Sequence, residues 1–165
     1  MDRLIATHQF KDALELVNKM AEGKQLQPDK AVTYRTEIKT AQKTTAMNLR
    51  REAQDHHAAK RYDDCVDAGR RAEVFEPLDA ATVFVLADAL RLSGDLTGAV
   101  RYFEKLGKEF PDHPHLDAAF YWRAEHLALT GKRDEARALL KKVGYELKKG
   151  SYQRLARRRL RELNR

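Results

Sequence analysis

The chain has 165 residues, of which 42% are hydrophobic and 35% are charged, and it contains only 8 glycines and 4 prolines. This composition, without a Val/Ile/Thr-rich alternating run, favours an all-α domain and argues against a β-rich fold. No stretch approaches the roughly 18 apolar residues that a membrane-spanning helix needs, and the basic-then-apolar pattern of a signal peptide is absent, so cytoplasm is the default location.

A short helix is predicted near the N-terminus, over residues 11–22, because apolar side chains recur there every three or four positions. These side chains are Phe10, Ala13, Val17 and Met20. Their spacing matches the second helix of a helical hairpin whose first helix is mostly missing, so residues 1–28 form a partial unit. We expect further repeats or another domain to precede Met1 in a longer natural protein.

One long helix is predicted from Asp29 to about Ala59, because this stretch has neither Gly nor Pro. At 1.5 Å per residue, about 30 residues make a helix of about 45 Å. It would be the extended first helix of a unit covering residues 29–79. The weak apolar stripe over residues 30–45 has two interpretations: it packs on helix 11–22, or it forms a coiled-coil arm for self-assembly.

The clearest unit covers residues 80–113, where two amphipathic helices flank a turn at Gly94. The same spacing recurs about 34 residues upstream and again over residues 117–150, after a polar, Pro-containing connection. Small residues occupy equivalent positions in all three units, where helix axes must approach closely. They are Ala53, Ala87 and Ala124 in the first helices, and Cys65, Ala99 and Ala136 in the second helices.

A helix–turn–helix unit of this length, with a small residue in each helix, resembles the tetratricopeptide repeat family. The resemblance implies an all-α, right-handed α-solenoid of helical hairpins, forming a single domain over residues 1–165. Two departures from the pattern stand out in the 29–79 unit: Lys60 replaces the turn glycine, and Gly69 replaces a bulky residue.

The resemblance also implies a concave groove lined by the first helices. The residues that would face it are Arg50, Gln54, His57, Phe84, Asp88, Arg91, Tyr121 and Glu125. Two aromatic side chains flanked by both charge signs suit an extended peptide or a partner helix. The lysine/asparagine pairs that hold a terminal carboxylate in some family members are absent. Alternatively, Phe84 and Tyr121 pack against each other or against neighbouring helices.

Residues 151–165 are predicted to form a basic capping helix, with Ser151 as its N-cap and Gly150 ending the helix before it. Residues 141–165 contain ten Lys/Arg and two Asp/Glu, which gives a net charge of +8. The basic side chains either form a solvated face or bind nucleic acid, anionic lipid or an acidic protein. This patch comprises Lys148, Lys149, Arg154, Arg157, Arg158 and Arg161.

No catalytic motif, Gly-rich phosphate loop or paired-cysteine metal signature occurs, so we expect no enzyme activity, no cofactor and no metal site. His113 and His115 flank a proline with too few further ligands for zinc. We expect Cys65 to be a buried packing thiol, and Asp88 and Glu125 to lie on exposed helix faces. The sequence thus predicts a scaffold or adaptor segment that binds a protein partner. Nucleic-acid or anionic-membrane binding and homo-oligomerisation are the alternatives.

Overall fold

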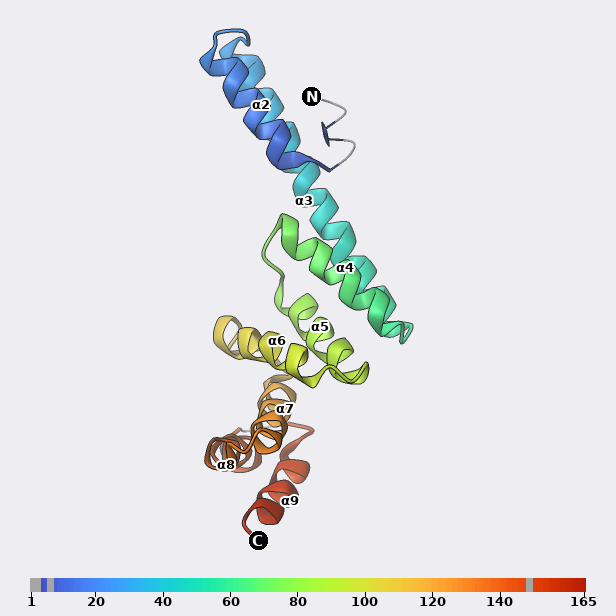
Figure 1. Cartoon of the computed structure of the whole chain (residues 1–165), viewed down its shortest axis with the longest axis vertical. Helices are drawn as coiled ribbons and strands as arrows, with labels where there is room; N and C mark the ends of the chain where they lie inside the picture. Colours follow the sequence, from blue (N-terminus) through green and yellow to red (C-terminus); the bar gives the residue numbers. More distant parts are fainter. Residues whose placement is uncertain (1–3, 6–7, 148–149) are drawn as a thin grey trace.

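The computed structural model describes residues 4–5, 8–147 and 150–165, and within these ranges it contains helices and no strand (Figure 1). This confirms the predicted all-α fold. The helices follow one another along an elongated stack, with each packed against the next. They are α2 (Phe10–Glu22), α3 (Pro28–Ala58), α4 (Tyr62–Phe75), α5 (Ala80–Leu92), α6 (Leu96–Glu109), α7 (Leu116–Leu129), α8 (Arg133–Lys141) with its π-helical continuation η1 (Lys142–Glu146), and α9 (Gln153–Leu163).

Helix α3 is long enough to pack against two other helices, α2 and α4. Its N-terminal half packs on α2 through buried Ala31 and Ile38, which is the first of the two interpretations of its apolar stripe. Its C-terminal half packs on α4. The ends of α2 and α4 meet beside the middle of α3, where the rings of Phe10 and Phe75 lie 5.5 Å apart in an edge-to-face arrangement. Whether α3 also mediates self-assembly stays a prediction.

The small residues at equivalent positions of the repeats all lie in the core. Each has 0% of its surface exposed, and each stands where a helix of one hairpin approaches its neighbour. The six residues are Ala53, Cys65, Ala87, Ala99, Ala124 and Ala136. A larger side chain at any of them would push two helices apart, so the repeat spacing in the sequence has a direct steric cause.

Gly69 departs from the repeat pattern because the next unit fills its space. A Cβ atom built on Gly69 would lie 1.9 Å from Cδ1 of Leu86, a fully buried side chain of α5. The bulky residue expected in α4 is therefore supplied by α5 instead. Lys60, the other departure, has a positive φ of +58°, as Gly94 and Gly131 have positive φ values of +95° and +83° at the equivalent turns. The chain keeps the turn there and accepts the strain of a side chain.

The end of the stack differs from the prediction. Helix α8 continues into the π-helical η1, which ends at Glu146, before Gly150, and Ser151 does not cap α9. The buried carboxylate of Asp117 instead accepts a hydrogen bond of 3.0 Å from the backbone N–H of Tyr152. A Cβ on Gly150 would lie 2.6 Å from the same carboxylate, so Gly150 gives it room. Helix α9 then covers the last hairpin with Ala156 buried against it.

Candidate functional site

The sequence-predicted groove residues lie where successive first helices meet, and most of them contact one another. Between α3 and α5, Nε2 of His57 lies 3.0 Å from Oδ2 of Asp88. The other oxygen of Asp88 accepts two hydrogen bonds from Arg91, from Nε at 2.9 Å and from Nη2 at 2.5 Å. Only 19% of the Asp88 side chain is exposed, so the expectation of an exposed carboxylate is wrong. Its position between two helices makes it a bridge.

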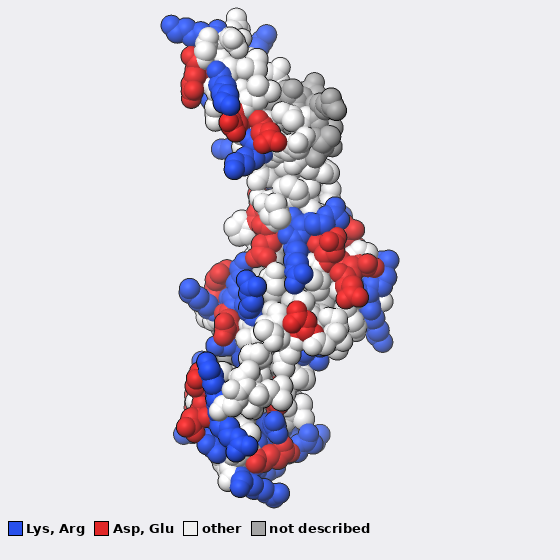
Figure 2. Space-filling view, viewed as in Figure 1, with Lys and Arg blue, Asp and Glu red and all other residues white. Residues whose placement is uncertain are grey.

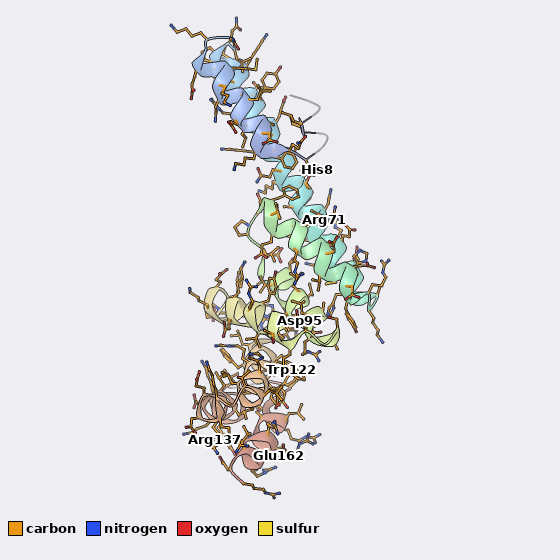
Figure 3. All side chains as sticks on the ribbon, in the orientation of Figure 1. His8, Arg71, Asp95, Trp122, Arg137 and Glu162 are labelled. Carbon is orange, nitrogen blue, oxygen red and sulfur yellow. The ribbon has the colours of Figure 1, made fainter. Side chains whose placement is uncertain are left out.

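The bridge continues from α5 to α7 through Trp122. The guanidinium of Arg91 lies over the indole ring, 4.5 Å from its centroid, in a cation–π contact. Figure 3 shows Trp122 where the α5–α6 and α7–α8 hairpins meet. The indole Nε1 donates a hydrogen bond of 3.3 Å to the hydroxyl of Tyr152, just ahead of α9. Trp122 is not among the residues that the sequence predicted for the groove.

Tyr121 and Glu125 complete the series toward α9. The Tyr121 ring lies 5.3 Å from that of Trp122 and 5.1 Å from that of Tyr152. Burial, with a smaller effect of the Glu125 carboxylate, raises the pKa of Tyr121 to about 12, so the phenol keeps its proton at neutral pH. Glu125 forms an ion pair of 3.0 Å with Arg159, and its side chain is only 16% exposed. It too was wrongly expected on an exposed face.

These contacts form one continuous set of side chains across α3, α5, α7 and α9, which we call the inter-repeat band. It consists of His57, Asp88, Arg91, Tyr121, Trp122, Glu125, Tyr152 and Arg159. Five of the eight were predicted from sequence as groove residues. Trp122, Tyr152 and Arg159 were missed. The available signal was the adjacency of Trp122 to Tyr121 in the sequence.

The remaining predicted groove residues flank the band. The Phe84 ring stacks on His115 at 4.5 Å with an interplanar angle of 20°, and it lies 5.6 Å from His113. It therefore packs against the α6–α7 connection, and no ring contact joins it to Tyr121 among the described residues. Burial and the neighbouring His115 lower the pKa of His113, which favours a neutral ring beside Phe84. The half-buried Phe84 forms an apolar edge to the band.

Arg50 and Gln54 form hydrogen bonds to the α4–α5 connection and to the start of α5. Nη2 of Arg50 donates 2.6 Å to the carbonyl of Pro77, and the guanidinium also lies near Glu76 and Asp79. Gln54 is exposed, and its amide reaches Oγ1 of Thr82 at 3.5 Å. Arg50 thus stabilises the α4–α5 connection. When the ion pairs of the band are included, every charged residue of the predicted groove has an ion-pair partner within the chain.

The basic patch is partly neutralised by local contacts. Nε of Arg157 donates a hydrogen bond of 2.6 Å to the carbonyl of Gly144 in the middle of η1, and Arg158 pairs with Glu162 at 3.7 Å. Arg154 and Arg161 are exposed, whereas Lys148 and Lys149 lie outside the described residues. In Figure 2, basic and acidic side chains alternate along the face in view, and the C-terminal tip is basic.

Other chemistry finds little support in the described part of the chain. No group of three or more His, Cys, Asp or Glu side chains there is arranged to hold a metal ion. Cys65 is fully buried, and this burial, with a contribution from Asp88, raises the pKa of its thiol to about 11. No helix in the described ranges is both long enough and apolar enough to cross a bilayer.

Comparison with protein-family models gives a match. A family model described as "Tetratricopeptide repeat" matches residues 76–160, which is more than half of the chain and extends from the connection before α5 into α9. Comparison with the curated proteins gave no match.

Proposed function

Because this chain belongs to the tetratricopeptide repeat family, we propose that it acts as a scaffold or adaptor module, binding a peptide or helix along its first-helix side. Repeats of this family generally mediate protein–protein interaction. The observation that supports this site is the inter-repeat band and its apolar edge at Phe84. They bring four half-buried aromatic side chains onto one side of α5, α7 and the start of α9, and these are Phe84, Tyr121, Trp122 and Tyr152.

The chemistry of these side chains favours a partner recognised by shape and aromatic contact. Tyrosine and tryptophan contribute large contact areas at low conformational cost and dominate many interfaces. The charges beside them, including Asp88 and Glu125, are already paired within the chain, so a partner need not neutralise them. We therefore expect an affinity in the micromolar range, about −8 kcal/mol, with weak dependence on salt.

A groove variant tests this proposal directly. In Phe84→Ala/Tyr121→Ala, two aromatic surfaces are lost from the binding side, and we expect at least tenfold weaker binding of the partner with the fold retained. The matched control is Leu129→Ala/Tyr145→Ala, which removes side chains that are 73% and 60% exposed and outside the band.

The partner itself is found by photo-crosslinking. A benzophenone side chain replaces Phe84 in one variant of the chain and Tyr145 in a second variant. A protein that crosslinks at position 84 and not at position 145 is then titrated against Phe84→Ala/Tyr121→Ala and against Leu129→Ala/Tyr145→Ala. Equal binding by the two variants, or unfolding of the groove variant with unchanged binding by the residual folded fraction, would contradict the proposal.

The basic tip favours a second candidate, binding to nucleic acid or an anionic membrane through Arg154 and Arg161. The observation that favours this second candidate is the net charge of +8 over residues 141–165. Phosphate binding by several cations weakens steeply with salt because counterions are released. Fluorescence titration with RNA, DNA and anionic vesicles at low and physiological salt separates the two candidates: tight binding of these probes that weakens steeply as salt is added, and remains measurable at physiological salt, would favour this second function.

A further inference from the structure

The second helices form a pocket that the proposed function does not use. It lies between α4 and α6 and has a volume of about 270 Å³. Its lining consists of Arg70, Glu73, Gly98, Arg101, Tyr102 and Lys105. We propose that this pocket binds a phosphoryl group carried on a side chain of a protein partner. The pocket is separate from the inter-repeat band, which is built from the first helices.

The charges in the pocket do not cancel. Nζ of Lys105 lies 2.7 Å from Oε1 of Glu73, and the hydroxyl of Tyr102 donates 3.0 Å to Oε2. The carboxylate of Glu73 is thereby fully engaged by groups of α6. Two further cations, Arg70 and Arg101, line the same pocket and are exposed to solvent. The pocket thus carries two positive charges beyond its internal ion pair.

The contacts of Glu73 with Lys105 and Tyr102 hold the two walls of the pocket, α4 and α6, in place. Burial alone would raise the pKa of Glu73, but the hydrogen bonds from Lys105 and Tyr102 lower it, with a contribution from the charge of Arg101. Glu73 therefore stays ionised and holds α6 against α4. The backbone N–H of Gly98, which lines the pocket, is already bonded to Asp95 at 2.8 Å. Recognition must come from the arginines and Lys105.

A phosphoryl group matches this arrangement in charge and geometry. It carries about −1.5 to −2 charges at neutral pH and presents three strong acceptor oxygens. Two guanidinium groups donate to such oxygens in a planar, forked geometry that an isolated carboxylate would satisfy less fully. The volume lies just below the range of about 300–1,000 Å³ usual for small-molecule sites, so it admits one side-chain-sized group. A nucleic-acid duplex would not enter it.

The test is a ¹⁵N–¹H NMR titration of the whole chain with inorganic phosphate, with sodium chloride at matched ionic strength as the reference. We expect a saturable shift of the Gly98 amide with a dissociation constant in the millimolar range. Arg70→Gln/Arg101→Gln should weaken binding at least tenfold, whereas Lys108→Gln, which removes an exposed charge of α6 outside the pocket, should not. Arg70→Lys/Arg101→Lys keeps the charge and should lose only part of the affinity.

Peptide titrations distinguish a phosphoryl group on a protein side chain from free phosphate. A phosphoserine peptide should bind at least tenfold more tightly than inorganic phosphate and than the same peptide with glutamate. Equal affinity for phosphate and phosphopeptide would overturn the assignment of a protein-borne group in favour of the free ion. Equal affinity for the glutamate peptide would overturn the phosphoryl assignment, and a linear shift that the glutamine variant retains would overturn the site.

Discussion

The contact between Gly69 and Leu86 gives the sharpest test of how the repeats stack. In Gly69→Ala the new methyl group would lie 1.9 Å from Cδ1, 2.9 Å from Cγ and 3.0 Å from Cδ2 of Leu86. Overpacking of this kind costs about 1–3 kcal/mol. Replacing glycine by alanine inside a helix returns about 1 kcal/mol. We therefore expect the variant to lose up to about 2 kcal/mol in free energy of unfolding.

The second variant, Leu86→Ala, removes the side chain that causes the clash. Because Leu86 is fully buried, its truncation should cost about 2–5 kcal/mol. In that background, Gly69→Ala meets no obstruction and should gain about 1 kcal/mol from helix propensity. The two changes should therefore couple by about 1–3 kcal/mol, equal to the overpacking cost that disappears.

Urea unfolding followed by far-ultraviolet circular dichroism measures this double-mutant cycle. Gly107→Ala is the matched control, since its new Cβ would contact Phe120 at 3.2 Å and not Leu86. It should change the free energy of unfolding equally in both backgrounds. A coupling energy below about 0.5 kcal/mol for Gly69 would refute the explanation that α5 fills the space left in α4.

Three further predictions concern single side chains. Lys60→Gly should raise the free energy of unfolding by about 0.5–1 kcal/mol, because it relieves the left-handed strain at φ +58°; a lower urea midpoint would contradict this. The Cys65 thiol, buried and with a pKa of about 11, should react with iodoacetamide at pH 8 at least about 10³-fold more slowly in the folded chain than in urea, and comparable rates would show that α4 is not packed as described. Because the pKa of Glu73 is lowered from 4.5, its contribution to stability is present at neutral pH and is lost as pH falls through the lowered pKa. The difference in free energy of unfolding between the natural chain and Glu73→Gln should therefore shrink below pH 4.5, and a constant difference from pH 7 to pH 3 would argue against the ion pair with Lys105.

The fold was predictable because its packing requires a recurring residue size. Ala53, Ala87 and Ala124 are small for a steric reason, so their spacing reveals both the repeat and its approximate length. The long α3 was predictable for a similar reason, since nothing between Pro28 and Ala58 interrupts a helix. Even the departure at Gly69 was visible, although its explanation required the position of Leu86 in the next unit.

The pairings across repeats were not predictable from register alone. Asp88 and Glu125 lie off the packing stripe of their own helices, and such positions are ordinarily exposed. They are covered because each first helix is offset against the next, which brings His57 to Asp88 and Arg159 to Glu125; Arg91 of the same helix also pairs with Asp88. A repeat pattern specifies equivalent positions but not this lateral offset. Trp122 and Tyr152 were missed for the same reason.

The C-terminal departures from the prediction have two causes, a π-helical turn and long-range hydrogen bonds. The sequence pattern of residues 133–149 gives no sign of the π-helical turn at 142–146, which ends the helix early. Helix α9 is then placed by long-range hydrogen bonds, from Tyr152 to Asp117 and from Arg137 to the Leu163 carbonyl. These contacts join residues far apart in sequence, so a search for a local N-cap selected Ser151 instead.

Hydrogen exchange of the chain with and without its crosslinked partner tests the central proposal most directly. We predict slower exchange in α5, α7 and the start of α9 when the partner is bound, little change in α4 and α6, and affinity that is nearly constant between low and physiological salt. Protection confined to α9 or the α4–α6 pocket, with binding that falls steeply as salt is added, would contradict recognition through the inter-repeat band.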